Sequence, residues 1–405
     1  MKKIYLVVLV GCICAAGLMP CQFTPGYLAF LSPVRVYGSQ RIEEGSQETE
    51  SELWLETQQQ IENALELEEM ETALSGILGD GQFSFRDTVK ALIRGDIPFE
   101  AEEILNLLLE VLMSEVRQQK TLVIQVMLIV LTAAVFSNFT RVFRSSQVAD
   151  ICFYMMYLLI SVILMKSFEI MNQVACDAVK SLISLMRVIL PSYLLTIVFC
   201  AGTITATGIS EILLFAFTML EAGMVEIMIP AVNFYLVLLI LNQMSNEDYF
   251  SKFAELLEMG IGWGIKTVLA VIVGLQTVQC LITPTVDSLK NGMLHKAAKA
   301  LPGIGNTLDA AAETIAGSAV VIKNAVGTAG VAAILFLCLV PVVKLFVCIL
   351  SIRVLCAVIQ PVGEKRLVEC ISSVAKGASL LLRIVFASMG VFMISIAMIT
   401  AMVKG

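Results

Sequence analysis

The stretch LPGIGNTLDAAAETIAGSAVVIKNAVGTAGVAAILFLCLVPVVK occupies residues 301–344 of the chain. It opens with a Pro-Gly-x-Gly breaker, continues through a small-residue helix, and enters an apolar span that contains Pro341 and Lys344. A soluble core has no need of that combination, and neither has a simple membrane anchor. We interpret the stretch as a mechanical or recognition element of a protein that crosses a membrane several times.

Small residues in this stretch follow a helical spacing. Alanines at every fourth position give the small-xxx-small pattern that permits close helix approach in lipid. A glycine allows a hinge or a close contact, and a proline removes a helix hydrogen bond and introduces a kink. Pro341 beside Lys344 is therefore either part of a discontinuous helix at a substrate site or an ordinary kink near an interfacial lysine. The candidate hinge and packing residues are Gly303, Gly305, Gly327, Ala325, Ala329, Ala333 and Pro341.

The composition of the whole chain agrees with a membrane protein. The 405 residues are 58% hydrophobic and 15% charged, and the mean hydropathy is +0.86. Several runs approach or exceed the roughly 20 residues that cross a bilayer. Little in the sequence suggests strands, and helices satisfy their own backbone hydrogen bonds in lipid. The predicted fold class is all-α: a polytopic α-helical membrane protein embedded in the lipid bilayer.

The membrane domain is predicted to occupy residues 120–405 and to contain six to eight transmembrane helices. The count stays open because one candidate is short and another carries two basic residues. Eight spans after an external N-terminal segment would leave the C-terminus external as well. The candidate spans are 122–139, 151–165, 179–200, 209–230, 232–244, 263–282, 327–350 and 378–403.

Residues 1–38 have the features of a secretory leader. Two lysines follow Met1, and an apolar run follows them. The cleavage site stays open, and so do a lipoprotein-type acylation at Cys12 and an uncleaved first span. All three possibilities place the next segment outside the cytoplasm.

Residues 39–119 form an acidic segment that we expect to be helical and extracytoplasmic. Residues 39–118 hold 19 of the 34 acidic residues and 5 of the 27 basic ones. A basic footprint is missing, so binding of nucleic acid is not expected. Apolar spacing predicts a long first helix, a short one within residues 83–99 and a third over 100–116. The segment is either a small solvated cap or a docking surface for a partner's external domain.

Two glutamates inside a predicted span are the candidates for transport chemistry. Glu221 and Glu226 lie within the span 209–230. A carboxylate inside the bilayer normally faces a cavity or a basic partner. An ion pair between helices and a proton or ion pathway both remain possible, and both predict burial in the bundle. The candidate partners are Lys266, Lys344 and Arg383, each in or beside another apolar run.

Enzyme chemistry finds no support in the sequence. The one histidine, His295, lies beside lysines, and no zinc-binding spacing occurs. The glycine-rich residues 260–267 lack the spacing of a phosphate loop and lead into a span, so energy from ATP would come from a separate subunit. The eleven cysteines contain no C-x-x-C pair and are expected to act as small apolar packing residues. We predict no catalytic residues, no metal site and no cofactor.

The C-terminal half resembles the stage III sporulation protein AE family. The residues that carry the resemblance run from Leu301-Pro302-Gly303-Ile304-Gly305 through Glu313-Thr314, Gly317-Ser318 and Lys323-Asn324-Ala325-Val326-Gly327 to Pro341 and Lys344, and include Gln360-Pro361-Val362-Gly363. The resemblance is specific from about residue 290 to the end. The first 120 residues resemble the family only in their layout, a leader followed by an external helical segment.

The resemblance implies a function that composition does not show. Members of the family are made in the mother cell of endospore-forming bacteria. They act with the other stage III A operon proteins, including a separate ATPase, in a transenvelope channel between mother cell and forespore. The expected role is a permease-like or export-gate-like platform in the mother-cell membrane around the forespore. An autonomous ion- or solute-coupled transporter is the alternative.

Overall fold

The structure is a computed structural model. It describes residues 84–94, 101–142, 146–201, 212, 215–244, 249–298 and 305–402. The chain divides into two compact units, Met1–Leu65 and Glu66–Gly405, and every described residue belongs to the second. The predicted leader and the long first helix of the acidic segment lie outside the described residues.

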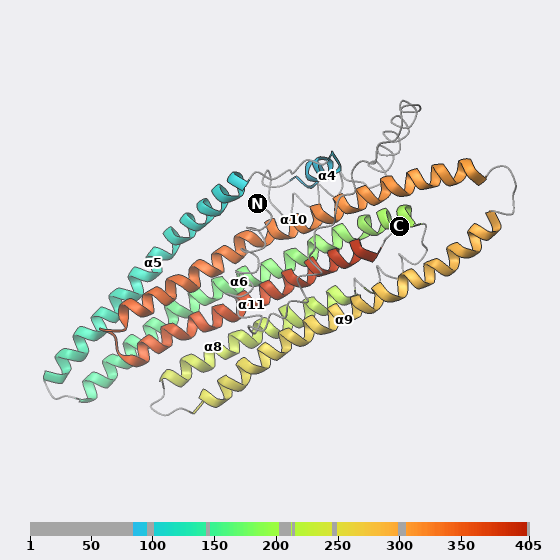
Figure 1. Ribbon diagram of the computed structural model, residues 1–405. Helices are drawn as coiled ribbons and strands as arrows, with labels where there is room; N and C mark the ends of the chain where they lie inside the picture. Colours follow the sequence, from blue (N-terminus) through green and yellow to red (C-terminus); the bar gives the residue numbers. More distant parts are fainter. Residues whose placement is uncertain are drawn as a thin grey trace, which may run out of the picture. The chain divides into compact units, whose positions relative to one another are not determined.

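Helices account for the fold, and no strand occurs in the described ranges (Figure 1). The prediction of an all-α polytopic membrane protein is therefore confirmed. In chain order the elements are α4 Phe85–Arg94, α5 Ala101–Val142, α6 Ser146–Ala201, the π-helix η2 Ala222–Met228, α8 Ile229–Met244, α9 Ser251–Ala298, α10 Gly305–Ile359 and α11 Lys365–Met402.

Six helices of the described chain are long and apolar enough to cross a membrane. Six is the lower limit of the predicted six to eight. Two pairs of expected spans overlap single candidate spans of the described chain. The spans 151–165 and 179–200 both belong to α6, and 209–230 and 232–244 contribute to one span. The candidate spans are Leu108–Val135, Phe153–Leu190, Phe215–Met244, Ser251–Val278, Asn324–Ile359 and Lys365–Thr400.

The predicted short helix within 83–99 is confirmed as α4. The predicted helix over 100–116 and the span 122–139 are one helix, α5, so the expected boundary at 119/120 falls inside it. A helix continues across a change from polar to apolar sequence because its backbone hydrogen bonds do not depend on side-chain polarity. Whether residues 39–119 behave as a separate domain stays a prediction.

Helix α11 lies at the centre of the bundle. It packs against α10, α6, α8 and α9, and Figure 1 shows α6 and α10 on one side of it and α8 and α9 on the other. Two-thirds of an apolar 18-residue stretch of its span is buried, whereas the corresponding stretches of α5 and α9, at the edges, are mostly exposed. Phe392 of α11 meets Phe217 with ring centroids 4.9 Å apart.

The alanines that recur at every fourth position of α10 face this core. Ala325 is 5% exposed, and Ala329 and Ala333 are fully buried. Gly330 lies beside them, and a Cβ there would meet Ile396 Cδ1 of α11 at 3.0 Å. The three alanines therefore lie on the buried face of α10, where larger side chains would push neighbouring helices away.

Candidate functional site

Glu221 forms an ion pair with Arg187 on α6. Arg187 Nη2 donates to Glu221 Oε2 across 2.7 Å, and the two side chains are 48% and 31% exposed. Lys266, Lys344 and Arg383 were the predicted partners, and for Glu221 that prediction is wrong. Arg187 was visible in the predicted span 179–200 as a basic residue inside an apolar run. The pairing required knowledge of which helices are neighbours.

The π-helix η2 begins directly after Glu221. The Ile229 N–H donates to the Met224 carbonyl, the i to i−5 bond of a π-helix. Gly223 is buried against α9, where an added Cβ would lie 3.1 Å from Val268 Cγ2. Pro230 follows at the start of α8 and has no N–H to donate. The helix therefore passes from the wide turns of η2 through Pro230 without interruption. The sequence predicted that the span would end at this proline, and it continues.

Glu226 and Lys266 lie at the same height along the bundle. Gly223 faces Val268 and Met228 faces Gly264, so the antiparallel register of η2 and α9 sets Glu226 level with Lys266. Both side chains are exposed, and neither makes an ion pair with another described residue. The prediction that Glu226 would be buried in the bundle is wrong.

The two charges remain apart because of helix geometry. Lys266 is two residues from both Gly264 and Val268, the residues of α9 that meet η2. A step of two residues along an α-helix rotates the side-chain direction by roughly half a turn about the helix axis. Lys266 therefore points away from η2, although its height matches that of Glu226. A charge at the centre of a lipid-facing helix costs about 2.5–3.5 kcal/mol by insertion scales.

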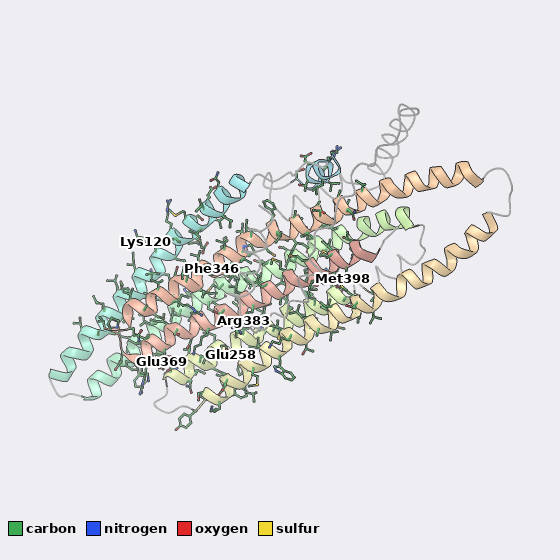
Figure 2. The ribbon with its side chains drawn as sticks, in the orientation of Figure 1. Lys120, Glu258, Phe346, Glu369, Arg383 and Met398 are labelled. Carbon is green, nitrogen blue, oxygen red and sulfur yellow. The ribbon has the colours of Figure 1, made fainter. Side chains whose placement is uncertain are left out.

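A further polar contact joins α8 to α9. Tyr235 Oη of α8 donates to Glu258 Oε2 of α9 across 2.7 Å. Arg383, the third predicted partner, is half-buried on α11, and Figure 2 marks it together with Glu258 of α9. Sequence reasoning missed Tyr235 and Glu258, although the carboxylate at Glu258 inside an apolar run was a usable signal.

The remaining predicted residues lie in α10 or beyond the described ranges. Lys344 and Pro341 are half-buried, and α10 continues through the proline. Gly327 is buried, Gly305 is the first residue of α10, and Gly303 lies outside the described residues. Lys344 is not brought together with the glutamates.

A polar stripe on α6 was not predicted at all. Seven exposed positions recur at intervals of three or four residues and so share one face of the helix. The opposite face packs against α10 and α11. Charges in lipid are costly, so a stripe of this length indicates a surface that faces water or a polar partner. The polar stripe comprises Lys166, Glu169, Gln173, Asp177, Lys180, Ser184 and Arg187.

The described residues hold no group of three His, Cys, Asp or Glu side chains placed to bind a metal ion. The glycine-rich residues 260–267 lie inside α9 and form no phosphate-binding loop. Cys338, Cys348 and Cys370 are buried with free thiols, and buried thiols of this kind act in packing. The chemistry that the site offers is therefore that of charged side chains held along a membrane bundle.

Comparison with known proteins places this bundle in a family. The model of the family described as stage III sporulation protein AE matches residues 83–403, which include every described helix. The chain belongs to the stage III sporulation protein AE family. Stage III sporulation protein AE of Bacillus subtilis (strain 168) is 22% identical over 311 residues, which cover 75% of this chain and 76% of that protein. No solved structure matches. The α6 stripe and the ion pair thus belong to a sporulation protein with membrane-type helices.

Proposed function

We propose that the protein is a membrane component of a sporulation-specific transenvelope channel that links mother cell and forespore. Its role there is that of a permease-like or export-gate-like platform. Family membership supplies the sporulation context. The observation that carries the channel role is the polar stripe of α6, which runs from Lys166 to the Arg187–Glu221 pair on the outside of the bundle.

The stripe fits an aqueous path better than a lipid contact. Its residues include both signs of charge, and the structure joins only its last member, Arg187, to an acid in an ion pair. Water or a polar partner chain would solvate the others at little cost, whereas acyl chains would not. The bundle provides one wall of such a path, and other chains complete it. The protein itself is not an enzyme in this proposal, and a separate ATPase supplies energy.

The ends of the helices suggest an orientation in the membrane. Consecutive spans alternate in direction, so the connections α5–α6, α8–α9 and α10–α11 lie at one end of the bundle (Figure 1). Arg366 there lies 5.8 Å from the ring centroid of Phe153. Basic residues mark the cytoplasmic side of membrane proteins, and the described residues at this end include Arg141, Lys252, Lys365 and Arg366. We place it in the mother-cell cytoplasm and the N-terminal segment in the space between the two membranes.

Co-purification tests the platform role. The full chain, tagged and recovered from sporulating cells, is expected to bring down other stage III A operon proteins, including their ATPase, as identified by mass spectrometry. The double variant Asp177→Leu/Lys180→Leu should reach the membrane in normal amount but lower the count of heat-resistant spores at least tenfold. Val162→Leu, an exposed apolar position on the same helix, is the matched control. Recovery of the chain without partners, or normal spore counts in the double variant, would contradict the proposal.

An autonomous transporter is the second candidate. The observation that favours it is the Arg187–Glu221 pair at the start of a π-helix, since irregular stretches of transmembrane helices form ion and substrate sites in transporters. Liposomes that contain only the purified chain separate the two functions. Proton-coupled uptake by these liposomes would show that the chain is a transporter on its own, and it would contradict the proposed platform role.

A further inference from the structure

We propose that α9 packs against η2 and α8 of a second copy of this chain, with Lys266 of one copy paired with Glu226 of the next. The two copies are related by an axis normal to the membrane. The proposal concerns self-association and does not depend on the channel role.

The exposed face of α9 has a clear centre. Its buried residues, Ala254, Ile261, Ile265, Ile272 and Gln276, lie on one side of the helix. Trp263 lies opposite them and is 71% exposed. Lys266 lies within about one-sixth of a turn of Trp263, so the lysine belongs to the outer face and not to its border.

Small residues continue this face beyond Trp263. Thr267, Ala270, Gly274 and Thr277 follow at intervals of three or four residues, and all are exposed. A Cβ built on Gly274 would meet nothing within 4 Å. Lipid requires no such small surface, whereas a second helix that packs closely does. The face therefore offers a shallow apolar surface beside one unpaired cation.

The neighbouring face of η2 and α8 has the complementary features. Glu226 is exposed on it and unpaired among the described residues. Large apolar side chains are exposed along the same span: Phe215, Met219, Ile227 and Phe234 are 50–58% exposed, and Phe234 also meets Phe253 of α9 edge-on. The face therefore offers an anion among bulky side chains, where α9 offers a cation among small ones.

The decisive relation is that the two faces match in height. The contacts of Gly223 with Val268 and of Met228 with Gly264 set Glu226 level with Lys266. By the same register Met219 is level with residues 272–273, beside Gly274. A rotation about an axis normal to the membrane preserves height, so a neighbouring copy presents its lysine opposite this glutamate. It also presents its small residues opposite Met219 and Phe215.

A second copy explains both unpaired charges at once. Within one chain the two side chains point in different directions, and each charge faces acyl chains alone. Between two chains each finds its counter-charge at the correct depth. A different membrane partner would need its own basic residue for Glu226 and its own acidic residue for Lys266 at this same height.

Charge exchange tests the pairing. The full chain is reconstituted in lipid nanodiscs or native membranes, and its assembly state is measured by mass photometry. Lys266→Glu and Glu226→Lys are each expected to weaken self-association at least tenfold, because like charges then meet. The double variant Lys266→Glu/Glu226→Lys is expected to restore it. Arg117→Glu, an exposed residue of α5 at the other edge of the bundle, should have no effect.

A cross-link locates the contact independently. A photoreactive amino acid at Ala270 is expected to attach to a second copy near Met219, as identified by mass spectrometry. A monomeric wild type, assembly that is insensitive to both single reversals, or a double variant that fails to recover would overturn the proposal. So would a cross-link from Ala270 to a different protein or to lipid alone.

Discussion

Arg187 and Glu221 stand 34 positions apart in the chain, and their side chains meet at 2.7 Å between Nη2 and Oε2. The pair joins α6 to the residue that precedes the π-helix η2. It closes the polar stripe of α6 at the point where the next span leaves regular helical geometry. The contact is compatible with two roles. It can stabilise the packing of two helices, and it can hold a carboxylate beside an irregular backbone where a path would pass.

Removal of one partner separates these two functions. Because both side chains are partly exposed, Arg187→Ala and Glu221→Gln are each expected to lower the free energy of unfolding by only about 0.5–1 kcal/mol. A double-mutant cycle on unfolding in detergent measures the coupling. If Glu221 and Glu226 line a path, Glu221→Gln and Glu226→Gln should also lower spore counts far more than this loss of stability explains. Normal sporulation of both variants would leave the glutamates with a structural role.

Steric bulk at Ala329 should disrupt the centre of the bundle. Ala329 is fully buried on α10, and added methylene groups in a packed core cost about 1–3 kcal/mol. Ala329→Leu is therefore expected to lower the melting temperature in detergent and the yield of folded protein. Thr328→Leu, one position earlier and exposed, is the control and should resemble the wild type. Equal melting temperatures for the two variants would show that α10 does not pack closely at this point.

Thiol labelling can report whether water reaches the polar stripe. A membrane-impermeant maleimide reacts with ionised thiols, which require water. In a variant without reactive native cysteines, Gln173→Cys should react rapidly, because its neighbours on the stripe are charged. Val162→Cys lies on the same helix at a position that is 58% exposed but apolar, and it should react at least tenfold more slowly. Equal rates would mean that the stripe has no aqueous surroundings of its own.

The Tyr235–Glu258 hydrogen bond should stabilise the contact of α8 with α9. Tyr235 is 1% exposed, and its hydroxyl donates to Glu258 Oε2. Tyr235→Phe keeps the ring and removes the donor, so a loss of about 1–2 kcal/mol is expected, since hydrogen bonds to charged groups are the stronger kind. Chemical unfolding in detergent measures it. Glu258→Gln keeps an acceptor and should cost less; a larger loss for Glu258→Gln than for Tyr235→Phe would contradict this expectation.

The confirmed prediction of the fold class rests on local patterns. Apolar runs longer than a bilayer is thick indicated helical spans. The alanine spacing at Ala325, Ala329 and Ala333 predicted a packing face, and the structure buries all three. Both signals are readable from neighbours in the sequence, because a helix brings residues three and four apart to one side. The resemblance in residues 301–344 pointed to the family for a similar reason, since it depends on residue types in order and not on contacts.

The errors concern helix boundaries and partners. Two apolar runs suggested two spans over residues 151–200, yet α6 contains both in one helix and carries its charged residues on an exposed stripe. Pro230 suggested the end of a span, yet the π-helix accommodates it. Glu226 was expected to be buried in the bundle, with Lys266 among its candidate partners, yet both side chains are exposed and the rotation of α9 points the lysine away from η2. None of these outcomes follows from the spacing of residues along one segment.

Sequence by itself determined that this protein is a helical membrane protein, because hydropathy and helical periodicity are properties of each segment alone. It also determined the family. Only the tertiary structure decided that Arg187 is the partner of Glu221, that α6 carries a continuous polar face, and that Glu226 and Lys266 are level but unpaired. These relations depend on how helices are rotated and shifted against one another. That rotation is set by the packing of α10 and α11 at the centre of the bundle, where residues far apart in the chain exclude all but one arrangement.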